Sequence, residues 1–274
     1  MILPYAGEKY FQVHGTSLTD TSGNQIGMVL VFNNITRIKK LENIRRDFVA
    51  NVTHELKTPI TAILGAAETM IGGAKDDPDD SKKFLDMIAK KSNLLNSLVD
   101  DLLVLARLEN EFDHEKLDLS PGKIVDVLNS SVKSCREQAD SRNVHIFCKC
   151  DPEIEAKINP RQLEQAAINL IDNAIKYSDS GSQITIKAET TQDEIVISVV
   201  DQGCGIESKH LPRLFERFYR VDKARSRDIG GTGLGLAIVK HIALAHGGTV
   251  SVDSILGQGS IFRIHLPHTD KDSH

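Results

Sequence analysis

The first part of the chain alternates between apolar and polar positions in the manner of two strands. Residues 10–14 alternate, residues 20–24 form a polar turn cluster, and residues 27–32 are mostly apolar. Two strands joined by a turn do not make a stable domain in water by themselves. We therefore expect residues 1–36 to be a hairpin from a larger sheet, in a chain that begins abruptly, as if cut from a longer protein.

From Ile35 onward the apolar residues follow a helical period. They recur at residues 35, 38, 41, 48, 52 and 56, which places one stripe along a long helix. The acidic, proline-containing segment 76–81 ends that helix and supplies capping side chains for a second one, which carries its own apolar stripe between Phe84 and Leu108. Two such helices cannot bury both stripes alone. Pairing with a second copy buries them, so residues 37–112 predict a homodimer built as an antiparallel four-helix bundle.

The second half of the chain mixes helical and strand patterns. We predict helices over residues 124–139, 160–177 and 233–246, and strands over residues 144–150, 183–189, 194–201, 249–254 and 260–266. Hairpins between the later strands predict a mixed sheet with helices on one face, so the fold class is α+β. We expect this domain to occupy residues 121–270, after a polar linker over residues 113–120.

Composition excludes several functional classes. The 274 residues suggest two domains and a fragment of a third, and the net charge of -5 argues against nucleic acid as a partner. No run of about 18 apolar residues and no signal peptide is present, so we expect no membrane contact in this chain and a cytoplasmic location. A membrane anchor in a longer protein stays open. Cys148 and Cys150 alternate within a strand pattern, which favours one strand face over a metal site.

His54 is the first candidate for chemistry. It lies two residues from both Val52 and Leu56, about 200° around the helix from each, so it should point into solvent. An exposed imidazole is largely neutral at physiological pH and offers a ring nitrogen for nucleophilic attack, while Glu55 can orient the ring or accept its proton. Pro59 cannot donate to the carbonyl of Glu55, which predicts a kink beside the histidine. Taken alone, however, an exposed helical histidine is usually only a surface residue.

Several later segments are typical of a nucleotide site. Asn169 and Asn173 are four residues apart, on one helical face, and amide oxygens suit Mg²⁺. Lys176 can meet phosphate charge, and the ring of Tyr177 can pack on a nucleoside. Each pattern is common by itself and often occurs in helices that have no binding function.

Two glycine-containing segments complete the predicted nucleotide site. Asp201 precedes Gly203 and Gly205, so it offers a carboxylate beside backbone that a base can approach closely. Residues 230–236 place four glycines before an apolar helix, where backbone N–H groups attract anions. This is neither a Walker loop nor a dinucleotide-binding fingerprint, because no Gly-Lys-Ser/Thr and no preceding strand are present. Residues 222–228 are interpreted as a mobile lid.

Taken in order, these segments resemble the sensor histidine kinases of two-component systems. Residues 46–51 and 54–59 match the H-box of the HisKA dimerisation domain. The N, G1, F and G2 boxes of the GHKL (Bergerat) ATP-binding fold match residues 169–178, 201–206, 214–220 and 231–236. The resemblance covers residues 38–267 and is similar to the phosphate-regulon type. The hairpin also resembles the end of a PAS sensor domain, with Asn34 in place of the usual acid.

The resemblance implies a role for each matched residue. His54 would be the phosphoacceptor, Glu55 its acid or base, and Thr58 the residue that holds water for the reverse, dephosphorylating reaction. Asn169 and Asn173 would hold Mg²⁺, and Asp201 would read adenine. The remaining residues expected around ATP are Lys176, Tyr177, Gly203, Gly205, Arg220, Gly231, Thr232, Gly233, Leu234 and Gly235.

The expected activity is transfer of phosphate from ATP to His54 and onward to an aspartate of a response regulator. Two alternatives remain open at this point. One is a GHKL ATPase that uses hydrolysis to change conformation, which leaves residues 54–59 unexplained. The other is a dimeric scaffold or phosphatase in which the nucleotide is only structural.

Overall fold

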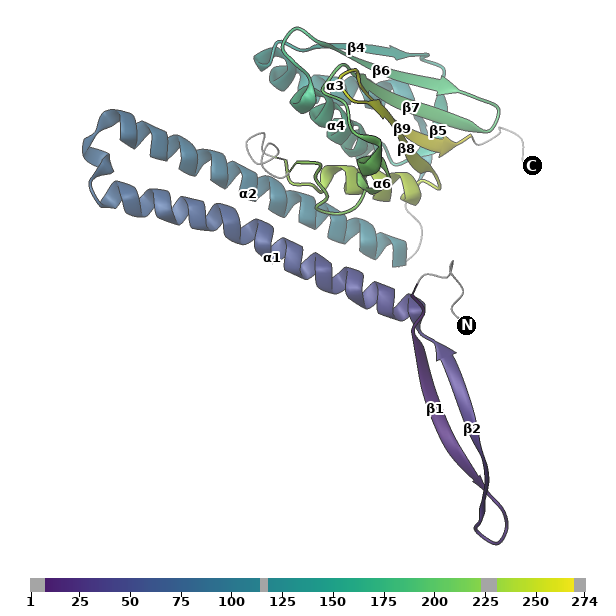
Figure 1. Cartoon of the computed structure of the whole chain (residues 1–274). Helices are drawn as coiled ribbons and strands as arrows, with labels where there is room; N and C mark the ends of the chain where they lie inside the picture. Colours follow the sequence, from purple (N-terminus) through teal and green to yellow (C-terminus); the bar gives the residue numbers. More distant parts are fainter. Residues whose placement is uncertain (1–7, 114–117, 223–230, 269–274) are drawn as a thin grey trace. The chain divides into compact units, whose positions relative to one another are not determined.

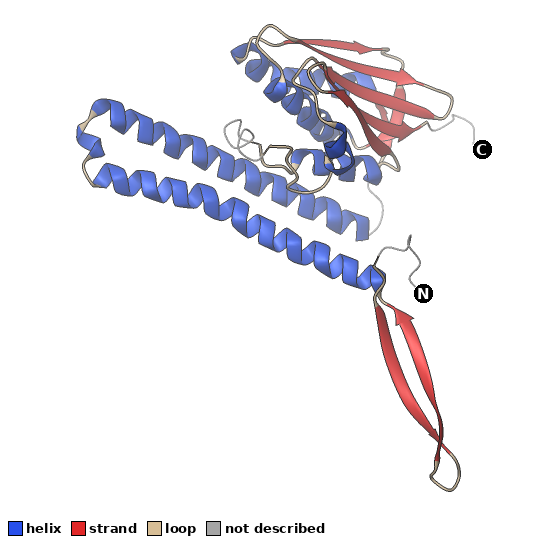
Figure 2. Ribbon diagram, in the orientation of Figure 1, coloured by secondary structure: helices blue, strands red, loops and turns tan. Residues whose placement is uncertain are grey.

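The computed structural model describes residues 8–113, 118–222 and 231–268. The chain divides into two units, residues 1–60 and 61–274, and each is described by itself (Figures 1 and 2). Helix α1 (Thr36–Ile71) runs from the first unit into the second. Within the described residues, no helix combines the length and the apolar character needed to cross a bilayer.

The first unit contains a β-hairpin and most of α1. Strands β1 (Phe11–Thr19) and β2 (Gln25–Asn34) pair antiparallel. Asp20 closes the turn between them, because its Oδ1 accepts hydrogen bonds from the backbone N–H groups of Ser22 and Asn24, both over 2.8 Å. The predicted hairpin is therefore confirmed. Its apolar side chains are exposed.

The second long helix begins where the acidic segment predicted a break. A 3₁₀ turn, η1 (Ala74–Asp76), connects α1 to α2 (Pro78–Asp113), and together they form a helical hairpin. Asp77 caps α2, since its Oδ1 accepts from the N–H groups of Asp79 and Asp80 over 2.9 and 3.3 Å. Proline at the first helical position costs nothing there, because its missing N–H would have had no partner within the helix.

A five-stranded sheet forms the centre of the second unit. Its order is β4-β6-β7-β9-β8, with β4 and β6 parallel and all other neighbours antiparallel. The bounds are β4 (His145–Cys150), β6 (Gln183–Thr190), β7 (Glu194–Asp201), β8 (Thr249–Ile255) and β9 (Gly259–Pro267). The mixed sheet and the α+β class are thus as predicted.

Three helices cover one face of this sheet: α3 (Ile124–Ser141), α4 (Pro160–Tyr177) and α6 (Gly235–Ala245) (Figure 1). Alternate residues of the strands point toward them and are buried, and cross-strand neighbours such as Val199 and Phe262 share this face. Burying these side chains removes apolar area from water and is the main force that holds helices and sheet together. The core includes Leu163, Leu170, Ile171, Ile175, Ile184, Ile186, Ile197, Ile238, Ile264 and Leu266.

The structure departs from the sequence-based prediction in several places. A second, two-stranded sheet of β3 (Ser120–Lys123) and β5 (Glu155–Ile158) was not predicted, and it begins within the expected linker. Helix α6 begins at Gly235 rather than Gly233, because Gly233 has a φ of +74°, which is incompatible with a right-handed helix. Helix α1 continues as one helix through Pro59, so the proline does not end it, and the kink there stays a prediction.

Candidate active site

His54 lies on α1 in the first unit and points into solvent, as predicted. Its side chain is 67% exposed, and its Nδ1 lies 3.5 Å from Oε1 of Glu55. The hydroxyl of Thr58, one turn later, donates to the backbone carbonyl of His54 over 3.1 Å. The three candidate catalytic residues of the predicted H-box therefore lie together on one stretch of helix. The ring is accessible to an incoming group, and a carboxylate stands beside one of its nitrogens.

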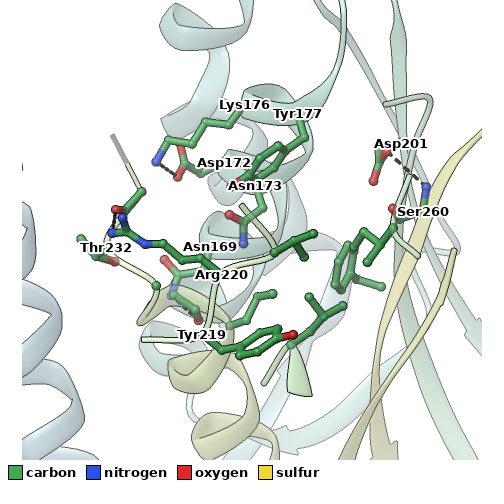
Figure 3. A pocket seen from close by; sticks show the side chains of 18 of the residues that line it. Asn169, Asp172, Asn173, Lys176, Tyr177, Asp201, Tyr219, Arg220, Thr232 and Ser260 are labelled. Carbon is green, nitrogen blue, oxygen red and sulfur yellow. Dashed lines mark hydrogen bonds and ion pairs between the residues drawn. The ribbon is translucent and has the colours of Figure 1, made fainter. Parts of the chain in front are cut away.

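The second unit contains a pocket of about 500 Å³ on the helix-covered side of the sheet. Eleven of the thirteen residues predicted to bind nucleotide line it. Gly203 and Leu234 are the two that do not, since both are buried behind it. Figure 3 shows Asp201 and Ser260 at one end of this pocket and Thr232 at the other. The pocket therefore has two chemically different ends.

Asp201 ends strand β7 on the helix-covered face and is buried, with 7% of its surface exposed. Its Oδ1 accepts hydrogen bonds from the backbone N–H groups of Gly203 over 2.8 Å and Ser260 over 3.2 Å. Burial raises the pKa of this carboxyl, and the two hydrogen bonds partly oppose that rise. Because both bonds go to Oδ1, the second carboxyl oxygen has no hydrogen-bond partner among the described residues and is available to a ligand in the pocket.

The two glycines after Asp201 allow the backbone to pack closely around it. A Cβ on Gly203 would overlap the carbonyl oxygen of Tyr177, and a Cβ on Gly205, whose φ is +64°, would overlap the carbonyl oxygen of Ile255. Glycine is the residue that tolerates both the contact and the positive φ. The sequence predicted glycines here for approach to a base, and the structure shows that neighbouring backbone also requires them.

Helix α4 presents a polar face to the pocket. Asn169 and Asn173 both line it, as their spacing predicted. The amide of Asn169 is held in place, since its Nδ2 donates to the carbonyl of Gly235 over 3.3 Å and its Oδ1 accepts from Gln165 over 3.4 Å. Within the described residues, the side chain of Asn173 has no hydrogen-bond partner and its amide is available to a ligand.

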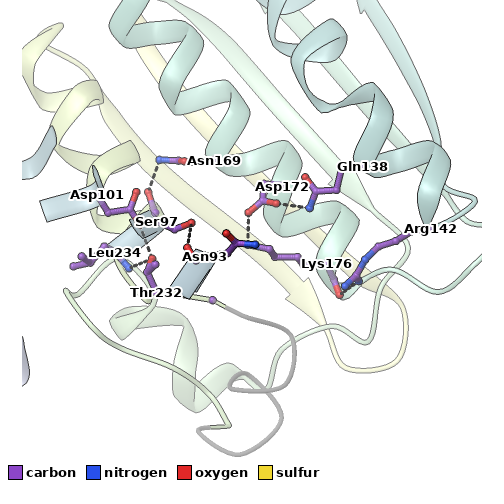
Figure 4. Close-up of polar contacts among 12 residues, drawn as sticks. Asn93, Ser97, Asp101, Gln138, Arg142, Asn169, Asp172, Lys176, Thr232 and Leu234 are labelled. Atoms are coloured by element: carbon purple, nitrogen blue, oxygen red, sulfur yellow. Dashed lines mark hydrogen bonds and ion pairs between the residues drawn. The ribbon is translucent and has the colours of Figure 1, made fainter. Parts of the chain in front are cut away.

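Lys176 is positioned by a residue that the sequence reasoning missed. Its Nζ lies 2.6 Å from Oδ2 of Asp172, one turn earlier on α4, and Oδ1 of Asp172 accepts from Gln138 on α3 over 2.6 Å (Figure 4). The ammonium is therefore fixed at the pocket by a carboxylate that is itself held. The spacing of four residues between Asp172 and Lys176 is a local signal that would have predicted the pair.

The glycine-rich segment lies at the other end of the pocket. Arg220 donates to the carbonyl of Gly231, and the N–H of Phe218 donates to the carbonyl of Gly233 over 2.8 Å. Thr232 accepts from the N–H of Leu234 over 3.2 Å, just before α6 begins. These contacts set the segment at the N-terminus of α6, where backbone N–H groups and the helix dipole favour an anion.

The residues before the segment form a small aromatic and basic cluster. Nδ1 of His210 lies 2.7 Å from the hydroxyl of Tyr219, and the guanidinium of Arg213 stacks 4.3 Å from the centre of the same ring. Tyr219 lines the pocket, so this cluster supports one of its walls. The predicted lid over residues 222–228 lies, apart from Asp222, outside the described residues.

The pocket also contains residues that were not predicted to bind nucleotide. Ser97 and Asp101 belong to α2 and lie in no motif, whereas Ile206 and Leu214, from the matched boxes, and Phe262 add apolar surface. Nothing local in the sequence marks the two α2 residues, because they meet the pocket through a contact between segments far apart in the chain. Among the described residues, no group of three or more histidine, cysteine or acidic side chains is arranged to hold a metal ion.

Two family models match this chain, the first over its helical part and the second over its α/β part. The model described as "His Kinase A (phospho-acceptor) domain" matches residues 44–111. The model described as "Histidine kinase-, DNA gyrase B-, and HSP90-like ATPase" matches residues 158–270. Together the matches cover the segment around His54 and all of the residues that line the pocket.

Known proteins show the same likeness. The phosphate regulon sensor protein PhoR of Pseudomonas aeruginosa is 38% identical over 246 residues, which are 89% of this chain and 54% of PhoR. The chain spans about half the length of the curated relatives it matches. The Acinetobacter baumannii histidine kinase AdeS is 29% identical with a TM-score of 0.63, over 79% of this chain and 98% of that one. Histidine kinase ThkA, solved with the response regulator TrrA, shares the fold, with a TM-score of 0.65 at 23% identity over 96% and 77% of the two chains.

Proposed function

Because the chain belongs to the sensor histidine kinases, with a phospho-acceptor domain followed by an ATPase domain of the histidine kinase type, we propose that it phosphorylates itself on His54. The phosphoryl group comes from ATP and passes on to an aspartate of a response regulator. One observation carries the proposal: a single chain combines an exposed histidine beside a carboxylate with a pocket whose two ends suit a base and a chain of phosphates.

The two ends of the pocket support ATP as its ligand. The free carboxyl oxygen of Asp201 is suited to accept from the exocyclic amine of adenine, with apolar side chains around it. At the other end, Lys176, Arg220 and the backbone before α6 offer positive charge and N–H donors to phosphates. Tyr177 lies between Lys176 and the Gly203 turn, where its ring can pack against the nucleoside.

The proposed Mg²⁺ fits the amide oxygens of Asn169 and Asn173. Neutral oxygen ligands that supply only one or two positions suit this ion, which keeps several waters and takes other oxygens from the phosphates. The held amide of Asn169 and the available amide of Asn173 match that requirement. Bound Mg²⁺ neutralises part of the phosphate charge during transfer.

The phosphoryl step follows from the surroundings of His54. A ring nitrogen forms a bond to the γ-phosphorus of ATP while the bond from that phosphorus to the bridging oxygen breaks, and ADP leaves. The carboxylate of Glu55, 3.5 Å from Nδ1, orients the ring and takes up its proton. Little covalent assistance is needed, because such transfers depend chiefly on positioning and on charge neutralisation.

Dimerisation is implied by the phospho-acceptor domain and is supported by the long helices. Each carries large apolar side chains that a single chain leaves exposed, among them Ile38, Leu41, Leu64, Leu85 and Leu103. Apolar stripes of this kind are buried when two helical hairpins form a four-helix bundle. We propose that the working form is a homodimer, which sedimentation equilibrium would test: a monomer at micromolar concentration would contradict it.

The exposed hairpin supports a sensor domain of the PAS type upstream of α1. The side chains of Val13, Ile26, Met28 and Phe32 are each at least half exposed on β1 and β2. Apolar strands of this kind are stable only within a larger sheet. Extending the chain at its N-terminus should therefore bury these side chains, which hydrogen exchange of β1 and β2 would detect as increased protection. Unchanged exchange would contradict the proposal.

Thr58 supports a reverse reaction, in which the same helix removes phosphate from the response regulator. Its hydroxyl is exposed and is held one turn from the histidine by its bond to the His54 carbonyl, so it can orient a water. Thr58→Ala should slow ADP-stimulated dephosphorylation of a phosphorylated regulator by about 10²-fold or more, and leave autophosphorylation within about twofold. Equal loss of both reactions would show that Thr58 only supports the helix.

The chemical stability of the phosphoprotein separates this kinase from an ATPase that does not phosphorylate itself. After incubation with γ-labelled ATP and Mg²⁺, the proposal predicts label on the protein that is lost in acid and retained in base, as expected for a phosphorus–nitrogen bond. Steady release of inorganic phosphate with no label on the protein would favour the ATPase instead.

A further inference from the structure

Helix α2 contributes a carboxylate to the wall of the nucleotide pocket. Ser97 and Asp101 are four residues apart, on one face of α2, and both line the pocket. The same helix contacts α6, which begins directly after the glycine-rich segment. Asp101 is therefore placed where the helical hairpin and the ATP-binding domain meet, within a single unit of the structure.

Asp101 is bonded to the middle of the glycine-rich segment. The hydroxyl of Thr232 donates to Oδ2 of Asp101 over 2.6 Å (Figure 4), a short distance typical of a hydrogen bond to a carboxylate. Thr232 lies between Gly231 and Gly233, and its Oγ1 also accepts from the N–H of Leu234. The carboxylate thus lies against the backbone that leads into α6, which is the part of the pocket that favours an anion.

The charges around Asp101 belong to the phosphate end of the pocket. The ammonium of Lys176 favours its ionised form, whereas Asp172 and the neighbouring Asp100 oppose it. Burial is the largest influence and raises its pKa. The pocket at this end already contains the ion pair of Asp172 and Lys176. A further phosphate group entering here would meet a carboxylate that is partly shielded from water, where repulsion between like charges is strong.

We propose that Asp101 determines which nucleotide the pocket prefers, by competing with the terminal phosphate of ATP for the glycine-rich segment. The proposal rests on the proposed function, in which this end of the pocket binds phosphates. ADP lacks the terminal phosphate and binds while Asp101 stays bonded to Thr232. ATP binding displaces Asp101. By thermodynamic linkage, the factor by which ATP favours separation of α2 from α6 equals the factor by which that separation strengthens ATP binding.

Calorimetric titration of the whole chain with ATP and with ADP, each with Mg²⁺ and at one salt concentration, tests the proposal. Asp101→Asn removes the charge, and its amide oxygen still accepts from Thr232, so the fold should be kept. The expected result is ATP binding tightened about 5- to 10-fold, at the lower end of typical coupling between sites, with ADP binding changed less than about twofold. Asp100→Asn is the matched control, because it removes the same charge from the neighbouring α2 residue outside the pocket; it should leave both affinities unchanged.

Three results would overturn the inference. An unchanged ratio of ATP to ADP affinity in Asp101→Asn would show that the carboxylate does not oppose the terminal phosphate. Weaker ATP binding would show that Asp101 helps to hold the nucleotide. An equal effect of Asp100→Asn would show that the change in affinity comes from the net charge of the chain and not from the position of Asp101. Absence of nucleotide binding by the unaltered chain is distinguishable from these, because it would contradict the proposed function and the inference with it.

Discussion

The backbone N–H of Ser260 on β9 donates to the side chain of Asp201 on β7 over 3.2 Å, so the carboxylate at the base-binding end of the pocket is fixed by the sheet itself. Together with the bond from Gly203, this contact fixes one carboxyl oxygen and leaves the other to a ligand. The pocket is thereby organised before any nucleotide enters, which lowers the cost of binding.

Asp201→Asn should separate folding from nucleotide binding. The amide oxygen of asparagine can still accept from Gly203 and Ser260, but its N–H₂ group then faces the amine of adenine, and two donors cannot bond to each other. We expect ATP binding to weaken by about 1–3 kcal/mol, the usual cost of an unsatisfied polar group. Calorimetry would measure the affinity, and unchanged ATP binding would contradict the assignment of Asp201.

The same variant has a predictable effect on pH dependence. The pKa of Asp201 is raised in the folded chain, so its contribution to stability is complete below the unfolded pKa of about 3.9 and is lost as pH rises through the folded value. Asp201→Asn removes this loss. Thermal unfolding across the acidic range should therefore show that stability falls less steeply with rising pH in the variant than in the unaltered chain. Identical slopes of stability against pH would contradict the burial of the Asp201 carboxylate.

Cys204 offers a direct probe of the pocket. Its thiol is exposed and lines the nucleotide site, whereas Cys148 is exposed on β4, away from the pocket. At an ATP concentration ten times above Kd, alkylation of Cys204 by N-ethylmaleimide should slow about tenfold, and alkylation of Cys148 should not change. Peptide mass spectrometry would follow both sites. Equal labelling of Cys204 with and without ATP would contradict the location of the site.

His246 makes the stability of the ATP-binding domain sensitive to acid. It is buried at the end of α6, where Nδ1 is 2.8 Å from the carbonyl of Ile242 and Nε2 accepts from the N–H of Asn159 over 3.0 Å. This pattern requires a neutral ring, and burial lowers its pKa. A lowered histidine pKa gives stability that is present above the unfolded value of about 6.5 and is lost as pH falls below it.

His246→Gln should accordingly lower stability at pH 7.5 by about 1–3 kcal/mol, because buried backbone groups lose their partners. It should also flatten the fall in stability between about pH 6.5 and pH 5. A residual slope is expected from His241, whose pKa is lowered by burial as well. Urea unfolding at several pH values would measure both effects. A variant that keeps the full slope would show that His246 is not the group that titrates.

Strong local signals in the sequence were enough to predict some elements closely. The predicted ends of helix α4 coincide with the observed ones. In the structure Asn159 caps the helix by accepting from the N–H of Gln162, and Pro160 suits the first position. Strand β3 was missed because it has four residues and includes Pro121 and Gly122, which predict a turn rather than a strand.

The residues of the candidate site likewise divide into those that local sequence signals predicted and those that they did not. Asn169 and Asn173 were found because helical spacing places them on one face, and Lys176 because its ammonium can meet phosphate charge. Asp101 was not found, because its bond to Thr232 joins residues 131 positions apart and leaves no local pattern in the sequence. Contacts of that kind are set by tertiary packing and become visible only in the structure.

Transfer of label from γ-labelled ATP to the chain and to its His54→Gln variant tests the central claim most directly. His54 lies outside the ATP pocket, so the variant should bind ATP with unchanged affinity. His14→Gln, which replaces an exposed histidine on β1, is the matched control and should label like the unaltered chain. The account predicts acid-labile label on the unaltered chain and none on His54→Gln. Undiminished labelling of His54→Gln would contradict it.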